Sequence, residues 1–129
     1  MPWRLKYLGL AATTRLPATQ ARGLAHAVHR ALVDTCGVPE NDLFQLITAY
    51  STDRMIIDPH YPHFQRSADA SIVEVLFLLG RTKAQKIRLF KAIADGAALA
   101  GFRADDIMVA LTENSPSDWS AGGGVPFGA

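Results

Sequence analysis

The sequence lacks three features, each of which would indicate a particular class of protein. With Cys36 as its single cysteine, the 129-residue chain can form no internal disulfide, and a reducing cytoplasm is the expected location. No apolar stretch reaches the roughly 18 residues that a membrane span needs. The 13 basic and 12 acidic residues nearly cancel, so no net field favours nucleic acid or a membrane surface as a partner. The composition predicts one soluble domain over residues 1–129.

A pattern occurs twice in the chain, at a separation of about 64 residues. In each copy a glycine, Gly37 or Gly101, is followed five residues later by an aspartate, Asp42 or Asp106. An aliphatic residue and a threonine follow at ten and eleven residues. Such a repeat indicates that one structural unit is present twice. An aspartate shared by both copies also suits turn or capping chemistry, which is the interpretation for Asp106.

Each copy has the pattern of a helix between two strands. Apolar residues recur at helical spacing over residues 19–36 and 82–100, with polar residues between them. Both helices should end at the glycine that follows, because glycine readily takes the left-handed conformation after a last helical turn. Thr82 is the expected N-cap of the second helix. Strand-like segments flank the helices at residues 3–10, 44–50, 71–79 and 108–112.

These elements predict an α+β fold in which two β-α-β repeats form a four-stranded sheet with two helices on one face. The repeats cover about residues 2–50 and 71–114, with a linker at about 51–70 and a C-terminal tail at 115–129. The other face of the sheet is apolar and has no helix to cover it. We therefore expect a homo-oligomer in which other subunits cover that face.

Pro2 is a candidate catalytic group. Removal of Met1 would leave the secondary amine of Pro2 as the new terminus, and an α-amino group titrates near 8 in water. Burial beside cations lowers such a pKa toward neutrality, where the amine can act as a proton shuttle. A proline after the initiator is also common in proteins that make no use of it, so Pro2 gains its weight from the rest of the sequence.

Three motifs add to Pro2 and the repeats. They read Gly37-Val38-Pro39 followed by Asp42, Gly80-Arg81-Thr82 followed by Gln85-Lys86, and Glu113-Asn114-Ser115 followed by Asp118-Trp119-Ser120. In these features the chain resembles the tautomerase superfamily and, within it, the malonate semialdehyde decarboxylase group. The resemblance spans nearly the whole chain. It implies a homotrimeric enzyme that needs no metal or organic cofactor.

The resemblance implies roles for particular residues. Pro2 would exchange a proton with the substrate or polarise its carbonyl, and Asp42 would orient the reacting groups or activate water. Arg81 would bind a substrate carboxylate through two parallel hydrogen bonds. Trp119 and Phe127 would form an apolar wall that strengthens charge interactions by excluding water. A tail packed across a subunit boundary is an equally good interpretation of these two aromatic residues.

The sequence departs from the group at two positions. Leu79 stands where a second arginine is usual in the substrate-binding site, and Ala121 stands where an aromatic residue is usual. A lost charge-assisted hydrogen bond is worth roughly 1.5 to 3 kcal/mol, so the substrate preference should differ. Arg4, Arg54 and Arg66 are candidates for supplying the missing charge.

The sequence as a whole favours an enzyme that acts on a small keto or enol carboxylic acid. Tautomerisation and decarboxylation both pass through an enolate, so one site could support either reaction. The alternative is a catalytically silent oligomeric binding or scaffold protein, which the departures at Leu79 and Ala121 favour. His60 and His63 lack further ligands at metal-binding spacing, and no flanking pattern supports Cys36 as a nucleophile.

Overall fold

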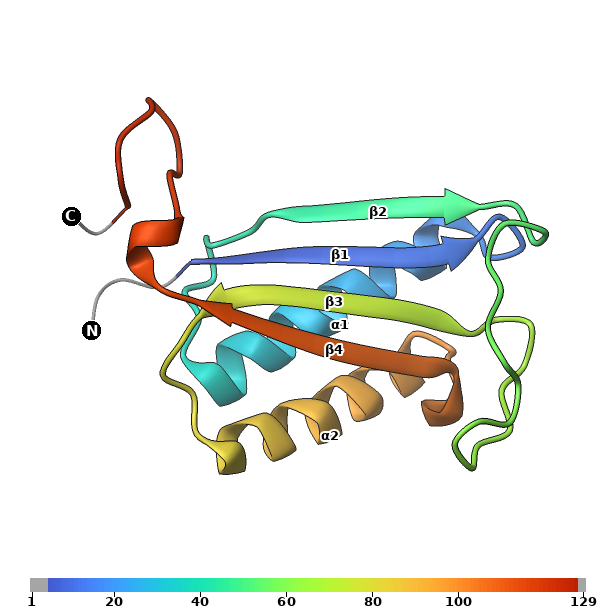
Figure 1. Cartoon of the computed structure of the whole chain (residues 1–129). Helices are drawn as coiled ribbons and strands as arrows, with labels where there is room; N and C mark the ends of the chain where they lie inside the picture. The colour runs from blue at the N-terminus through green and yellow to red at the C-terminus, as the bar shows by residue number, and fades with distance from the viewer. Residues whose placement is uncertain (1–4, 128–129) are drawn as a thin grey trace.

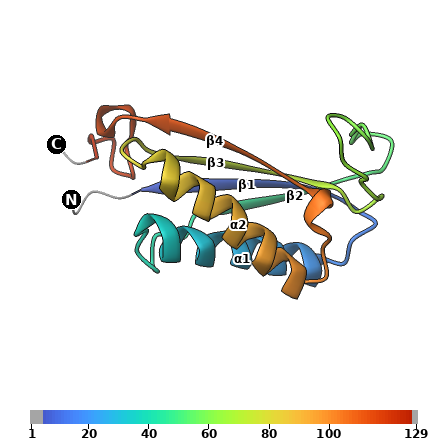
Figure 2. The same ribbon diagram turned by 90° about the horizontal axis from the view of Figure 1, so that it is seen from below.

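The computed structural model describes residues 5–127 and confirms the predicted fold class. Two helices, α1 (Ala18–Cys36) and α2 (Lys83–Leu99), lie side by side on one face of a single sheet (Figures 1 and 2). The strands are β1 (Lys6–Thr13), β2 (Gln45–Tyr50), β3 (Ser71–Leu78) and β4 (Ile107–Asn114), and short 3-10 helices occupy Ala104–Asp106 and Pro116–Asp118. None of the helices in residues 5–127 has the length and apolar character that a bilayer crossing needs.

The sheet has the strand order β2-β1-β3-β4. Strand β1 pairs in parallel with β2, and β3 pairs in parallel with β4, so each β-α-β repeat supplies one parallel pair. The two repeats join through β1 and β3, which run antiparallel in the middle of the sheet. As a result, the start of β1 and the end of β3 lie at the same end of the molecule (Figure 1).

The predicted ends of the helices agree with the structure to within one residue. Gly37 follows α1 in the left-handed conformation, with φ of 68°. The Thr82 hydroxyl accepts a hydrogen bond from the Gln85 amide at 3.1 Å, while the Gln85 side chain accepts one from the Thr82 amide at 2.9 Å. This capping box fixes the start of α2 directly after Arg81.

The prediction for the first strand was wrong in its limits, since β1 continues past residue 10 to Thr13. Ala11, Ala12 and Thr13 pair with β2 at Thr48–Tyr50. Two small alanines carry little strand preference of their own, so pairing with the neighbouring strand decides their conformation. β4 is longer than predicted for the same reason, because its ends at Ile107 and Asn114 pair with β3.

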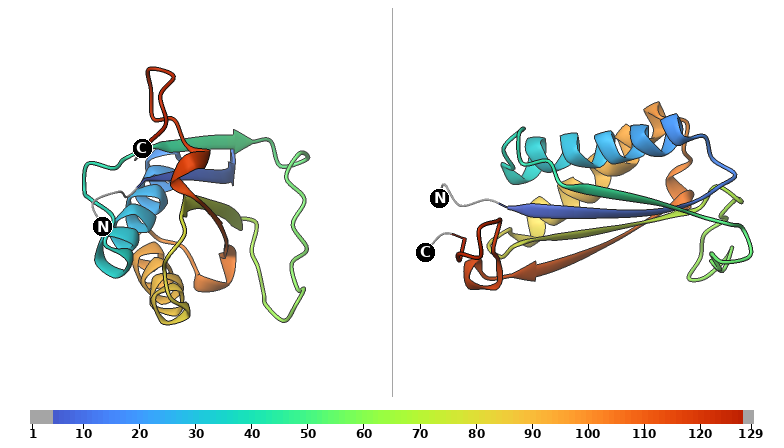
Figure 3. Two further views of the ribbon diagram at one scale, coloured as in Figure 1. Left: turned by 60° about the vertical axis from the view of Figure 1, so that its left-hand side comes forward. Right: turned by 90° about the horizontal axis from the view of Figure 1, so that it is seen from above.

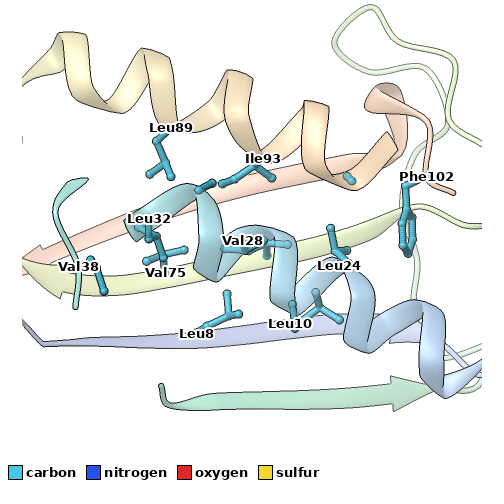
Figure 4. Close-up of a cluster of buried hydrophobic side chains, with 14 of the residues drawn as sticks. Leu8, Leu10, Leu24, Val28, Leu32, Val38, Val75, Leu89, Ile93 and Phe102 are labelled. Carbon is cyan, nitrogen blue, oxygen red and sulfur yellow. The ribbon is translucent and has the colours of Figure 1, made fainter. Parts of the chain in front are cut away.

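The core lies between the sheet and the two helices (Figure 4). Alternate residues of the two central strands point into it, namely Leu8, Leu10, Ala12, Val73, Val75 and Phe77. The helices contribute Leu24, Val28, Leu32, Leu89, Ile93 and Ala97. Between the helices, Gly96 packs against Ala27 so closely that an added Cβ would lie 3.0 Å from the Ala27 Cβ. Small residues at this contact therefore set the spacing of α1 and α2.

Within residues 5–127, no helix lies on the opposite face of the sheet (Figure 3). Its large apolar side chains are partly or fully exposed, among them Tyr7, Leu46, Tyr50, Ile72 and Met108. Small residues of β1 lie between them, and Glu74 of β3 is the acidic group that borders the same hollow. The predicted open apolar face is therefore present in the single chain.

The segment at residues 51–70 forms a loop at the end of the sheet away from the start of β1 (Figure 1). Asp106 holds this loop, because its carboxylate accepts hydrogen bonds from the Ser67 amide at 2.7 Å and the Ser67 hydroxyl at 2.6 Å. Only 1% of Asp106 is exposed. Arg66 braces the loop from within by donating to the carbonyls of Asp58 and Tyr61. The structural interpretation of Asp106 agrees with these contacts.

Replacing Asp106 with Asn should lower the free energy of unfolding by about 2 kcal/mol, because hydrogen bonds to a charged group are worth about 1.5–3 kcal/mol. Urea unfolding at one fixed protein concentration measures the change. Asp53→Asn, at an exposed position of the same loop, is the control and should stay within about 0.5 kcal/mol of the parent. Equal stability of the two variants would show that Asp106 does not anchor the loop.

Candidate active site

The structure brings most of the predicted site residues to one end of the sheet. Asp42 lies just before β2 and Arg81 just after β3, and both segments reach the end where β1 begins (Figure 1). Leu79 follows β3 directly, and the tail that carries Trp119 and Phe127 leaves β4 at the same end. Pro2 lies outside the described residues.

Within one subunit, the loop at residues 51–70 lies at the end of the sheet away from Leu79. Arg54 and Arg66 belong to the loop at the opposite end of the sheet, and Arg66 is engaged there by two main-chain carbonyls. Neither arginine reaches the site within one subunit. Arg4, the third candidate, lies outside the described residues.

Asp42 is a buried carboxylate, with 7% of the residue exposed. Its Oδ1 accepts a long hydrogen bond of 3.5 Å from the Lys6 amide. Its Oδ2 is buried and has no hydrogen-bond partner among residues 5–127. Burial raises the pKa of Asp42, while the Lys6 charge and the Lys6 amide hydrogen bond, followed by smaller contributions from His29 and Arg81, act in the opposite direction. The site therefore contains a carboxyl group whose proton affinity is higher than usual.

Lys6 is fully buried, with 0% of the residue exposed. Its Nζ donates a hydrogen bond of 2.8 Å to the main-chain carbonyl of Asp42. Burial lowers the pKa of Lys6, and the nearby Asp42 carboxylate raises it in part. Sequence reasoning did not single out Lys6. The signal was present, because Lys6 has the same strand parity as Leu8 and Leu10 and therefore points into the core.

Arg81 is held by its own turn. Its Nη1 donates to the carbonyl of Leu78 at 2.7 Å, and its guanidinium carbon lies 4.9 Å from the centre of the Phe77 ring. Only 8% of Arg81 is exposed. These contacts fix the plane of the guanidinium. Less conformational entropy would therefore be lost when it binds a carboxylate. Its charge also lowers the pKa of Asp42, so the two predicted residues interact electrostatically.

His29 of α1 is a further buried polar residue near Asp42 and Lys6. Sequence reasoning did not assign it a role. Its Nε2 lies 2.9 Å from the carbonyl of Glu40. A carbonyl can only accept, so Nε2 carries the proton. Burial, with the Lys6 charge as the next contribution, lowers the pKa of His29. This hydrogen bond ties α1 to the loop that carries Asp42, and a surface ion pair between Arg30 and Glu40 at 2.9 Å supports it.

The tail is shaped by a few short-range contacts. The Trp119 indole donates to the side-chain oxygen of Asn114, and the main-chain amide of Phe127 donates to the Trp119 carbonyl at 2.8 Å. The Asn114 carbonyl in turn accepts from the Leu79 amide at 2.8 Å. Asn114 thus joins the tail to the turn that precedes Arg81. Leu79 itself is 59% exposed, so its side chain lies at the surface in the single chain.

The residues of the sequence motifs contact one another. Lys86 and Glu113 form an ion pair of 2.7 Å that joins the start of α2 to the end of β4. Ser115 and Asp118 form a second capping box at the start of the tail. The ion pair therefore joins the second motif to the third. Within the part of the chain that is described, no group of three or more metal-ligating side chains is present.

Comparison with known proteins gives consistent matches. The profile of a family described as tautomerase enzyme matches residues 42–122. Probable tautomerase YusQ from Bacillus subtilis (strain 168) is 30% identical over 102 residues, which cover 78% of this chain and 80% of the relative. The crystal structure of FG41 malonate semialdehyde decarboxylase inhibited by 3-bromopropiolate is 37% identical, with a TM-score of 0.86 over 92% of this chain and 91% of that chain. A fused 4-OT, described as a symmetric trimer, shares the fold at 20% identity, with a TM-score of 0.76 over 93% and 94% of the two chains.

Proposed function

This chain belongs to the tautomerase family, and we propose that it is an enzyme that uses the amine of Pro2 to act on a small keto or enol carboxylic acid. The observation that carries the proposal is that Asp42 and Arg81 lie at the end of the sheet where β1 begins, close enough for the Arg81 charge to lower the pKa of Asp42. A fixed guanidinium beside a buried carboxyl of raised pKa is an arrangement that functional sites favour.

In the proposed reaction, Arg81 binds the substrate carboxylate and Pro2 acts on the neighbouring carbonyl or enol. The enolate that forms carries negative charge, which fixed cationic groups stabilise without rearrangement of solvent. Asp42 accepts a hydrogen bond from the terminal amine or from a water molecule. Support for this role comes from its buried Oδ2, because a buried acceptor normally receives a donor and residues 5–127 supply none.

The protonation state of Pro2 decides between the two reactions. A neutral amine removes a proton from carbon and returns it elsewhere, which is tautomerisation. A protonated amine polarises the carbonyl, so that the bond to the carboxylate carbon breaks and its electron pair moves into the enolate, with release of carbon dioxide. Similarity to probable tautomerases supports the first reaction, and similarity to malonate semialdehyde decarboxylase supports the second.

We also propose that three copies of the chain assemble through the open face of the sheet. The exposed apolar residues on that face need a cover, and the fused 4-OT of the same fold is a trimer. An apolar wall formed by Trp119 and Phe127 would then lie close to a neighbouring subunit, which reconciles the two interpretations of the tail.

Sedimentation equilibrium should give a mass of three times the 14.0 kDa chain. Leu46→Asp, which places a charge on the open face, should dissociate the assembly. Leu99→Asp is the control, because Leu99 is 93% exposed on α2, away from that face, and this variant should remain trimeric. A monomeric parent protein, or an assembly that tolerates Leu46→Asp, would contradict the proposed interface.

Replacing Pro2 with Ala should lower the ketonisation rate of phenylenolpyruvate by about 100-fold or more, the usual contribution of a positioned acid or base. Protein that retains Met1 should show the same loss, because its proline nitrogen is an amide. Thermal unfolding of the variants should change little. Activity that survives both changes would rule out Pro2 as the reacting group, and the absence of activity in the parent would favour the silent scaffold.

Introducing a second guanidinium by Leu79→Arg should lower the KM for malonate semialdehyde by about tenfold, since a gained charge-assisted hydrogen bond is worth roughly 1.5 kcal/mol or more. The exposed position of Leu79 means that the change removes no core contact. Leu99→Arg adds the same charge on the far side of α2 and should leave the KM unchanged. A KM that responds equally in both variants would show that Leu79 does not face the substrate.

A further inference from the structure

The burial of Lys6 has no explanation in the packing of the core. The side chain lies on the helix side of β1 beside Leu8, where an aliphatic residue would pack without loss of hydration. Burying an ammonium group costs several kcal/mol unless partners compensate for it. The charge at this position should therefore do something that an apolar residue could not.

The contacts of Lys6 concentrate on one residue. Its Nζ binds the main-chain carbonyl of Asp42 at 2.8 Å, while its amide reaches the Asp42 carboxylate at 3.5 Å. The segment before Asp42 is also fixed by His29, through the Glu40 carbonyl. Two elements, β1 and α1, thus hold this short loop, and Lys6 of β1 is the group that binds Asp42 directly.

We propose that Lys6 is a positioning residue for the reaction, in which its buried ammonium fixes the Asp42 main chain and keeps the Asp42 carboxylate ionised beside the substrate. This inference rests on the proposed function of the site. Lys6 does not contact the substrate in this scheme, since its side chain is fully buried and its Nζ is directed at a main-chain carbonyl. Arg81 keeps the task of binding the substrate carboxylate.

The charges around Asp42 determine in which direction its pKa should change when Lys6 is replaced. The charged or titratable groups that act on Asp42 are Lys6 from β1, His29 from α1 and Arg81 from the turn after β3. Burial raises the pKa of Asp42 and the Lys6 charge lowers it, so removing that charge raises the pKa further. A protonated Asp42 can no longer accept a hydrogen bond at both oxygens or take up a proton. Activity would then require a higher pH than in the parent enzyme.

The test compares Lys6→Met, which keeps an unbranched side chain one atom shorter and removes the charge, with Lys6→Arg, which keeps the charge. In Lys6→Met, kcat measured on the acid side of the pH profile should fall by about tenfold for each pH unit by which the acid limb moves. The acid limb of the pH profile should move to higher pH, with KM within about threefold because Arg81 is intact. In Lys6→Arg, the acid limb should lie near its position in the parent enzyme. Lys91→Met removes an exposed lysine of α2 and should leave the profile unchanged.

A purely structural Lys6 would lower thermal stability and the active fraction without moving the acid limb, and that result would overturn the proposal. Should Lys6→Met not fold, Lys6→Gln removes the charge and keeps a donor for the Asp42 carbonyl. Carboxyl-carbon and lysine-nitrogen NMR titrations of the parent protein need no turnover, so they separate this inference from the proposed function. A Lys6 amine that is neutral where Asp42 titrates would also overturn it.

Discussion

The antiparallel pairing of β1 with β3 is the constraint on which the candidate site depends. It sets Lys6 opposite Phe77, and the ring of Phe77 carries the guanidinium of Arg81. Two cations that are 75 residues apart in the sequence thereby reach the same end of the sheet. Parallel pairing of each outer strand then brings Asp42 to that end from the first repeat. The chemistry of the site is therefore a consequence of strand order and direction.

Bringing buried charges together in this way costs stability, and the surrounding contacts limit that cost. Lys6 donates a hydrogen bond to the Asp42 carbonyl. Arg81 donates one to the Leu78 carbonyl and lies over the Phe77 ring. Each cation is thus solvated by a main-chain group that cannot change its charge. The Asp42 carboxyl is less well compensated, because burial outweighs the nearby positive charges and raises its pKa. Shifted pKa values of this kind are common at sites where a group must exchange protons.

The sequence predicted those features that arise from local interactions. Gly37 and Thr82 act through the neighbouring turn, so their patterns were sufficient for the ends of both helices. The repeat and the motifs placed Asp42 and Arg81 correctly in the fold. Lys6 and His29 were missed because their importance lies in contacts with residues that are distant in the sequence, 36 residues away for Lys6 and Asp42. The alternation of β1 indicates that the Lys6 side chain points inward, but it does not indicate which distant residue the ammonium group contacts.

The two aspartates of the repeat show how one sequence position acquires two roles. Asp42 precedes β2 and Asp106 precedes β4, and because the repeats run in opposite directions the two residues lie at opposite ends of the sheet. At one end β1 begins near the chain terminus. At the other end the 51–70 loop leads into β3, and Ser67 of that loop donates two hydrogen bonds to the Asp106 carboxylate. No equivalent of this loop lies beside Asp42 among residues 5–127. The Oδ2 atom of Asp42 is therefore buried without a hydrogen-bond partner in that part of the chain. The Asp106 carboxylate is therefore engaged in structural hydrogen bonds, and the proposed chemistry is confined to the end of the fold where Asp42 lies.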